Sequence, residues 1–223
     1  MDEKSYKGMR YLEDVYNTEH GAHIGLTVLA LHWMTGEAES LRFMFEEVEI
    51  PLRVVYAQGV YPSEMPEGGW SWFPDGVAFY EARSLAQQAP DVRTIANNLA
   101  DFLWFLENAH GGKFAVTGIS QGGDLSLALA LYHAETLDLA LPMAGRLPPE
   151  FRPETLPHGK RVPQIVMLQG AADDVVPVAT AREAHAWLKA QGCDADYHEY
   201  PDVGHGISEA MVADVLARLA EIA

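Results

Sequence analysis

The chain has 223 residues, of which 32 are acidic and 15 basic, so its formal net charge is −17 with histidine neutral. A field of this sign repels nucleic acids and anionic lipid surfaces, so we expect neither as a stable partner. Hydrophobic residues make up 48% of the chain, and we expect one folded domain over residues 1–223. Nothing in the pattern indicates an oligomeric state.

The first residues carry no apolar run typical of a secretory signal, and no stretch reaches the ~18 apolar residues of a membrane helix. We therefore expect a cytoplasmic protein. Cys193 is the single cysteine, which leaves no partner for an intrachain disulfide. No cluster of His, Cys, Asp or Glu has convincing ligand spacing, so we expect neither a metal ion nor a cofactor.

Short apolar runs alternate with helical periods along the chain. The runs typical of strands buried on both faces are residues 24–32, 52–57, 114–119, 137–143 and 165–168. A more polar segment, 8–18, is compatible with a hairpin partner at the sheet edge, and 194–200 with a polar strand. Helices are predicted over 91–108, 122–133, 178–191 and 208–222.

This alternation predicts an α/β fold with a mainly parallel sheet covered by helices on both faces. Ligands of such sheets bind beyond the carboxyl ends of the strands. Candidate functional residues are therefore sought in the loops that follow the predicted strands.

Residues 118–122 read Gly-Ile-Ser-Gln-Gly, the G-x-S-x-G pattern, between a predicted strand and a predicted helix. A serine at the apex of such a turn projects into the cleft as a nucleophile. The amide of Gln121, at the helix N-terminus, faces a developing oxyanion. Asp124 lies in the first turn of that helix, and we expect it to interact with the helix dipole and to point away.

A serine nucleophile needs a histidine base, which in this fold follows the acid in the chain. The downstream candidates are His133, His158, His185, His198 and His205. Only His205 lies in a glycine-flanked loop between a strand and a helix, so it is the predicted base. For the orienting acid, the residues alone leave Asp173, Asp174 and Asp202 open.

Three segments together resemble the phospholipase/carboxylesterase family, which includes the acyl-protein thioesterases. They are GISQGG (118–123), LQGAADDVVP (168–177) and HEYPDVGHGIS (198–208), in the order and spacing of the family's signature regions. The resemblance implies the α/β-hydrolase fold and a serine carboxylesterase that works through an acyl-enzyme. It also implies that the acid is Asp173, four residues before the proline that ends the second segment.

The resemblance is weaker towards the N-terminus. LALHWMTG (29–36) is similar to the family's LHGxG loop, which supplies the second oxyanion amide, but Trp33 and Thr35 stand where the family has glycine. By position the donor is the amide of Met34. Two interpretations of Trp33 stay open: its indole lines the substrate pocket, or it packs against the end of the sheet.

An aromatic segment, WSWFP (70–74), is similar to segments beside the family's acyl pocket, so we expect Trp70, Trp72 and Phe73 to line a substrate pocket. Filling of the ordinary core is the alternative. A small-molecule ester of short or medium chain length fits the charge better than a phospholipid. Two other functions stay open: a thioesterase or lysophospholipase with the same residues, and a non-catalytic ligand-binding α/β-hydrolase with an altered oxyanion loop.

Overall fold

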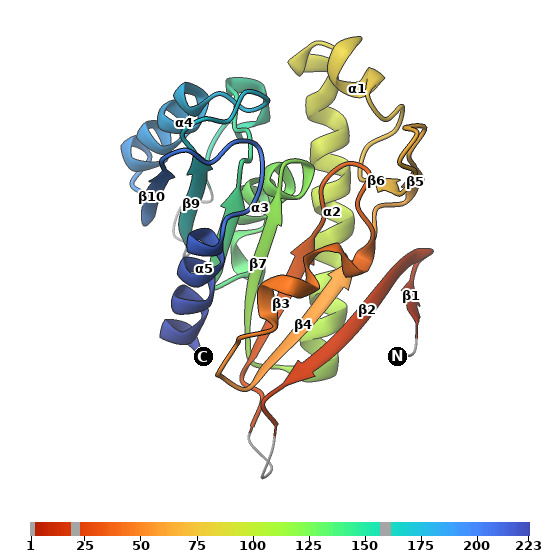
Figure 1. The fold of residues 1–223 in the computed structure, drawn as a ribbon, viewed down its shortest axis with the longest axis vertical. Coiled ribbons are helices and arrows are strands. Elements are labelled where there is room, and N and C mark those ends of the chain that lie inside the picture. The colour runs from red at the N-terminus through yellow and green to blue at the C-terminus, as the bar shows by residue number, and fades with distance from the viewer. Residues whose placement is uncertain (1–2, 19–22, 157–161) are drawn as a thin grey trace.

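The computed structural model describes residues 3–18, 23–156 and 162–223, and its centre is a twisted eight-stranded sheet (Figure 1). The strands lie in the order β1-β2-β4-β3-β7-β8-β9-β10, with β1 and β2 antiparallel and the others parallel. Their bounds are β1 Lys4–Tyr6, β2 Met9–Tyr16, β3 Leu26–Leu31, β4 Leu52–Ala57, β7 Lys113–Ile119, β8 Leu139–Met143, β9 Gln164–Gly170 and β10 Ala195–Tyr200. A separate two-stranded ribbon pairs β5 (Tyr61–Pro62) with β6 (Trp70–Ser71).

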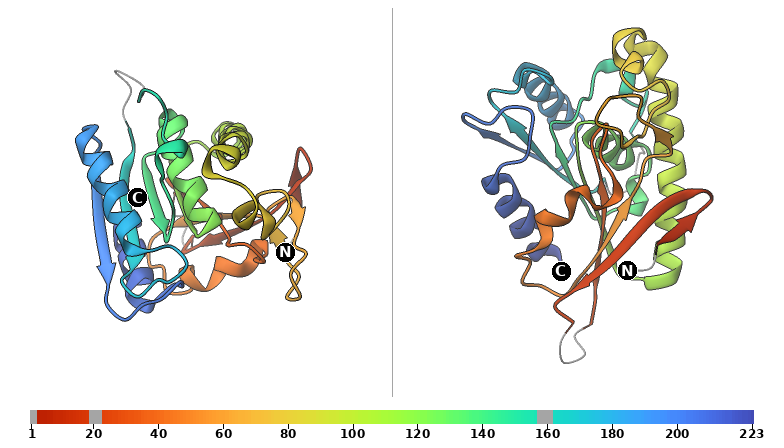
Figure 2. Two further views of the ribbon diagram at one scale, coloured as in Figure 1. Left: turned by 90° about the horizontal axis from the view of Figure 1, so that it is seen from above. Right: turned by 45° about the vertical axis from the view of Figure 1, so that its right-hand side comes forward.

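Helices cover both faces of the sheet (Figure 2). The first face carries α2 (Leu85–His110), α3 (Gln121–Tyr132) and α4 (Val178–Ala190), and the second carries the 3-10 helix η2 (Ala38–Phe45) and α5 (Glu209–Ile222). The remaining helices are short: α1 Ala78–Glu81, η3 Ala134–Thr136 and η4 Pro149–Phe151. The predicted layer order, a mainly parallel sheet between helices, is thus confirmed.

The pattern of β3 shows why its sequence is almost entirely apolar. All six of its residues are buried. Leu29 and Leu31 face the core under α2 and α3, whereas Val28 and Ala30 face the core under η2 and α5. Because neighbouring side chains of a strand point to opposite faces, a strand covered on both sides needs an unbroken apolar run.

Most predicted elements are found within a few residues of their expected bounds. The segment 8–18 contains β2, which forms a hairpin with the edge strand β1 and also pairs with β4. Helix α2 differs, because it begins at Leu85 rather than at residue 91. Ser84 and Gln87 form a capping box there, with the Ser84 amide donating to Gln87 Oε1 over 2.9 Å. Helix η2 was not predicted, and His158 lies outside the described residues.

Within the described parts of the chain, no helix combines the length and apolar character needed to cross a membrane. The carboxyl ends of β3, β7, β9 and β10 lead into four loops that carry the predicted functional residues.

Candidate active site

Ser120 forms the turn between β7 and α3 and has a left-handed backbone, with φ 56° and ψ −114°. Its amide donates to the carbonyl of Met143 on the neighbouring strand over 3.0 Å. The flanking glycines are needed because the turn is tight: a Cβ on Gly118 would lie 2.6 Å from the Gly122 carbonyl carbon, and one on Gly122 would collide with the Leu31 carbonyl. This is the strand-to-helix turn that the motif requires.

His205 lies in the loop between β10 and α5, and its Nδ1 is 2.9 Å from Asp173 Oδ2 and 3.1 Å from Oδ1. Because a carboxylate only accepts, Nδ1 carries the hydrogen and Nε2 is left as the basic nitrogen. The two loops are joined by backbone as well, since the Ala172 amide donates to the Val203 carbonyl over 2.9 Å. The ring is thereby fixed in one tautomer and one orientation.

The Asp173 carboxylate is buried and receives three further hydrogen bonds. The amides of Val175 and Val176 donate to Oδ1 over 2.9 and 2.8 Å, and the Gln169 side chain donates to Oδ2 over 3.0 Å. Burial alone opposes ionisation, but the Val176 amide, His205 and the Val175 amide outweigh it and hold the pKa of Asp173 below its ordinary value. The group that faces His205 is therefore a carboxylate.

Of the three acids left open by the residues alone, the structure brings only Asp173 to His205. Asp174 and Asp202 are both exposed. Gln169 was not predicted to take part; a polar residue at the end of an otherwise apolar strand was its only signal.

Ser120 and His205 line one cavity of about 470 Å³ at the carboxyl edge of the sheet. The rest of its lining is largely apolar and contains no basic side chain except His205 itself; it consists of Trp33, Met34, Phe43, Ile119, Val175, Gly206 and Ile207. Such a cavity suits an uncharged group with few polar atoms.

The two residues whose backbone amides are predicted to bind the oxyanion, Gln121 and Met34, are both near this serine. Gln121 is the first residue of α3, so its N–H has no acceptor within the helix. Met34 follows β3 and itself lines the cavity. Neither amide donates to an acceptor in the part of the chain that the structure describes.

Trp33 unites the two interpretations of its position, because it lines the cavity and also packs against the buried cluster under η2 and α5. The loop that carries it makes a tight turn, in which the Gly36 amide donates to the Trp33 carbonyl over 3.0 Å and Thr35 adopts φ 74°. Trp33 has no positive φ, whereas Thr35 holds a left-handed conformation that ordinarily favours glycine.

The buried imidazole of His32 is hydrogen-bonded to this turn and to the segment after β4. Its Nδ1 lies 2.6 Å from the Trp33 carbonyl, while its Nε2 accepts from the Gly59 amide over 2.9 Å. The ring must therefore be neutral and protonated on Nδ1. Burial lowers the pKa of His32 to about 4.

The aromatic segment lies elsewhere than predicted. Trp72 and Phe73 are buried in the core on the α2 side of the sheet, Phe73 stacked on Phe79, and Trp70 is half-buried in β6. None of Trp70, Trp72 and Phe73 lines the cavity of Ser120. The prediction that they form its wall is wrong; Trp72 and Phe73 instead pack in the buried cluster that includes α2.

This segment instead connects the two turns that carry the predicted oxyanion amides. The Trp72 amide donates to the Gln121 side chain over 3.0 Å, and Trp72 Nε1 donates to the His32 carbonyl over 2.9 Å. The Thr35 amide donates to the Trp70 carbonyl over 2.9 Å. We call residues 70–72 the brace.

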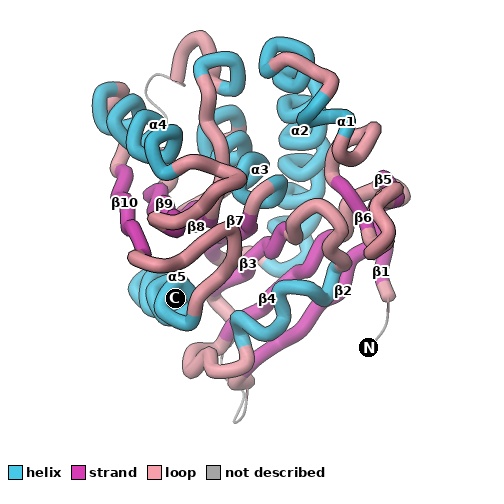
Figure 3. The backbone as a smooth tube through the Cα atoms, turned by 45° about the horizontal axis from the view of Figure 1, so that its top comes forward, coloured by secondary structure: helices cyan, strands magenta, loops and turns pink. Residues whose placement is uncertain are grey.

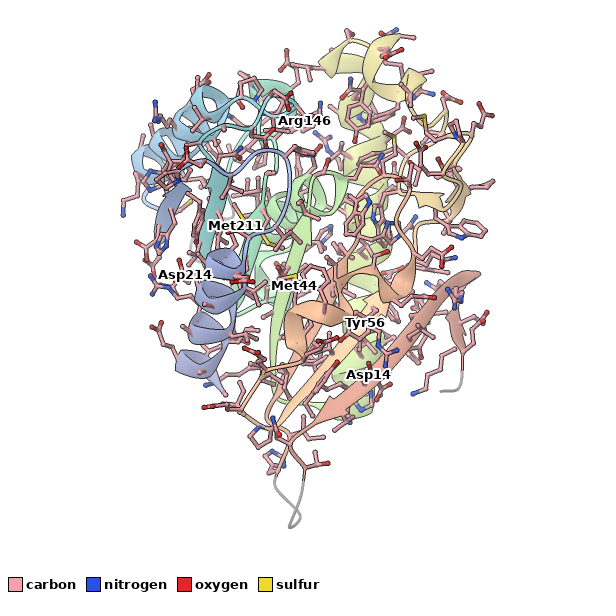
Figure 4. All side chains as sticks on the ribbon, in the orientation of Figure 1. Asp14, Met44, Tyr56, Arg146, Met211 and Asp214 are labelled. Atoms are coloured by element: carbon pink, nitrogen blue, oxygen red, sulfur yellow. The ribbon has the colours of Figure 1, made fainter. Side chains whose placement is uncertain are left out.

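Asp124 is buried, does not line the cavity and is ion-paired with Arg146, with Nη2 and Oδ2 2.6 Å apart. Arg146 is labelled in Figure 4. The Arg146 backbone amide also donates to Asp124 Oδ1 over 2.6 Å, and its guanidinium lies over the Tyr80 ring. The expectation that Asp124 points away from the oxyanion position agrees with this pairing. The pair fastens the first turn of α3 to the segment after β8.

No three His, Cys, Asp or Glu side chains among residues 3–18, 23–156 and 162–223 are placed to share a metal ion.

Comparison with known proteins adds three findings. Residues 27–222 match the model of the phospholipase/carboxylesterase family. In rice (Oryza sativa subsp. japonica), a probable inactive carboxylesterase is 29% identical over 94 residues and a probable carboxylesterase is 32% identical over 91 residues; these matches cover 41% and 40% of this chain. They span only 38% and 39% of the two relatives.

The fold is that of solved esterases. The carboxylesterase from Mesorhizobium loti superposes with a TM-score of 0.77 over 99% of both chains, at 18% identity. The predicted α/β-hydrolase fold is therefore confirmed.

Proposed function

Because the chain belongs to the phospholipase/carboxylesterase family, we propose that it is a serine hydrolase that cleaves carboxylic esters of short or medium chain length. The observation that carries the proposal is the shared cavity of Ser120 and His205, with His205 hydrogen-bonded to the Asp173 carboxylate over 2.9 Å. Acyl transfer by a serine needs three parts: the hydroxyl as nucleophile, a basic nitrogen that takes its proton, and a group that orients the base.

In the proposed reaction, His205 Nε2 takes the proton of Ser120 Oγ as that oxygen attacks the ester carbonyl carbon. The negative charge that forms on the carbonyl oxygen is bound by the amides of Met34 and Gln121. The protonated His205 then gives its proton to the leaving alcohol. Water, activated by the same nitrogen, attacks the acyl-enzyme and releases the acid, which regenerates Ser120.

Asp173 does not change its protonation in this scheme. It holds His205 in the Nδ1–H tautomer and stabilises the imidazolium that forms in each half-reaction. The amides of Val175 and Val176 and the side chain of Gln169 keep the carboxylate ionised and pointing at the ring.

A volume of about 470 Å³ and an apolar lining support a substrate of modest size with an uncharged reacting end. The whole reaction is proposed for a single α/β-hydrolase domain over residues 1–223, with no cofactor.

Non-catalytic ligand binding is the second candidate, and two observations favour it. Trp33 stands where the family's loop has glycine, and one of the rice relatives is described as probably inactive. Against it, the amides of Met34 and Gln121 have no protein acceptor among the described residues, as an oxyanion site requires.

A fluorophosphonate probe separates the two candidates, because it phosphonylates a serine only where a base has activated it. For the hydrolase we expect stoichiometric labelling of Ser120, absent from Ser120→Ala and from heat-unfolded protein, and a loss of about 10⁶-fold in ester turnover for Ser120→Ala. A folded protein that binds esters but neither reacts with the probe nor turns over any ester would show that the binding function is correct.

A further inference from the structure

A second hollow of about 410 Å³ lies next to the cavity of Ser120 and is lined by residues of η2 and α5. Both helices pack on the same face of the sheet, and the backbone of α5 can be followed in Figure 3. Phe43 and Ile207 line both spaces. The two hollows therefore lie side by side, with these two side chains between them. We call the second hollow the η2–α5 groove.

The groove has an apolar floor and walls and an acidic rim. Its apolar lining is Phe43, Met44, Ile207, Val212, Ala213 and Leu216. Met44 belongs to the same buried cluster as Met211 of α5, and both residues are labelled in Figure 4. The rim consists of Glu46, Glu47 and Glu209, which are all exposed, and no basic side chain lines the groove.

The exposure of Phe43 fits this arrangement. Its side chain is 46% exposed although it is a large aromatic residue on a helix whose neighbours Met44 and Phe45 are fully buried. A ring at that position contributes little to the core, but it forms the wall where cavity and groove join. Apolar surface left open beside a reactive centre is typical of a ligand-binding surface.

The position of the groove relative to His205 indicates which half of an ester the groove would bind. The chain runs from His205 and Gly206 in the cavity through Ile207 at the junction to Ser208 in the groove. An imidazole that protonates the leaving oxygen must lie beside that oxygen. A group attached to the leaving oxygen therefore starts next to His205, on the side where the chain continues into the lining of the groove.

We propose that the η2–α5 groove binds the alcohol part of the ester, as an apolar chain that carries no negative charge and is too long for the cavity of Ser120. This inference rests on the proposed function. The three rim glutamates repel a carboxylate on the chain, and a buried methylene gains up to about fourfold in binding. In a groove open to solvent on one side, we expect about twofold for each methylene.

Two ester series test the proposal. One keeps acetate as the acid and lengthens the alcohol from ethyl to octyl; the other keeps ethanol and lengthens the acid from acetate to octanoate. For the wild-type protein we expect kcat/KM to rise about twofold per methylene along the alcohol series. An acetate ester of a hydroxy acid, with a carboxylate at the far end of the alcohol, should lose this gain.

Ala213→Trp fills the groove from an exposed position on α5, and Ala217→Trp is its matched control, because Ala217 is exposed one turn further on and does not line the groove. We expect Ala213→Trp to abolish the gain for long alcohols while leaving ethyl acetate and the acid series unchanged, and Ala217→Trp to behave as wild type. Circular dichroism of both variants checks that α5 is intact.

The proposal is overturned if the wild-type alcohol series is flat, if Ala213→Trp affects the acid series instead, or if it affects neither. These outcomes all require ester turnover and leave the proposed function standing. If no ester is turned over and Ser120 takes up no fluorophosphonate, the hydrolase itself is wrong, and the alcohol site falls with it.

Discussion

Asp173 and Asp174 are neighbours in the chain with the same side chain, yet only one can orient an imidazole. Asp173 is buried and hydrogen-bonded to His205, to two backbone amides and to Gln169. Asp174 is exposed. The difference arises because the turn after β9 buries Asp173 and Val176, whereas the residues between them are exposed.

We predict that Asp173→Asn lowers kcat by about 10⁴-fold, because an amide at this position favours the wrong tautomer of His205. Asp174→Asn should change kcat by less than about threefold. Steady-state kinetics with one p-nitrophenyl ester measures both. Equal losses in the two variants, or a larger loss for Asp174→Asn, would contradict the assignment.

The sequence predicted the neighbourhood of Ser120 and His205 because each lies in a glycine-flanked loop after a strand, and the fold brings such loops to one edge. Their roles, like that of Asp173, stay predictions until tested. Gln169 was missed for a physical reason. Its side-chain amide acts through a hydrogen bond to Asp173 that forms only when β9 and the following turn are folded, so no sequence motif indicates this contact.

His32 gives a pH dependence of stability whose sign follows from its lowered pKa. The ordinary pKa of 6.5 falls to about 4 in the folded protein. Between these values the unfolded chain binds a proton that the folded chain does not. The contribution of His32 is therefore fully present above pH 6.5, is lost as the pH falls towards 4, and amounts to about 3 kcal/mol.

We predict that His32→Gln, measured by urea unfolding between pH 4.5 and 6 in comparison with wild type, removes about 1 kcal/mol per pH unit from the slope of the unfolding free energy. The slope, not the absolute stability, is the readout, because the substitution is destabilising in itself. Identical slopes in the two proteins would show that His32 titrates normally.

At the scale of elements, the brace at residues 70–72 explains how a loop without the family's glycines keeps its shape. It fastens the turn after β3 through the Thr35 amide and the His32 carbonyl, and it fastens α3 through the Gln121 side chain. Sequence composition could not distinguish this role from a pocket wall, because aromatic residues are equally typical of both.

We predict that Trp72→Phe lowers kcat about tenfold with little change in KM. The ring is largely kept, but the hydrogen bond from Nε1 to the His32 carbonyl is lost, which loosens the turn that carries the Met34 amide. An oxyanion amide acts mainly in the transition state, so kcat is the sensitive parameter. Stability should fall by about 1–2 kcal/mol, since a buried carbonyl loses its donor.

Trp104→Phe is the matched control, because Trp104 is 64% exposed on α2. It should change neither kcat nor stability. If Trp72→Phe loses stability but keeps the wild-type kcat and the wild-type rate of fluorophosphonate labelling, the brace supports the fold alone.

The start of α2 shows a second limit at this scale. The helical period of apolar residues placed the expected start at residue 91. Pro90 stands just before it, and proline ordinarily breaks the interior of a helix. The capping box of Ser84 and Gln87 nevertheless begins the helix six residues earlier. Two opposing local signals lie within six residues, and packing of the following amphipathic helix on the sheet stabilises the longer form.

At the scale of the whole molecule, layer order was predictable because the apolar runs of the central strands indicate burial on both faces. The net charge is also a property of the whole molecule, and its value follows from composition rather than from the fold. The net charge of −17 surrounds a cavity whose lining contains no basic side chain except His205, and three glutamates border the adjoining groove. The summed potential therefore concentrates cations at the site.

Acetylcholine, the acetate ester of choline, and 3,3-dimethylbutyl acetate have nearly the same shape, but only acetylcholine carries a positive charge. We predict that kcat/KM for the choline ester falls about threefold to tenfold as ionic strength rises from 0.01 to 1 M, because the screening length shrinks from ~30 to ~3 Å. The neutral ester should respond little, and it corrects for any effect of salt on the protein itself. Parallel salt dependence of the two esters would mean that the acidic surface does not act on the substrate.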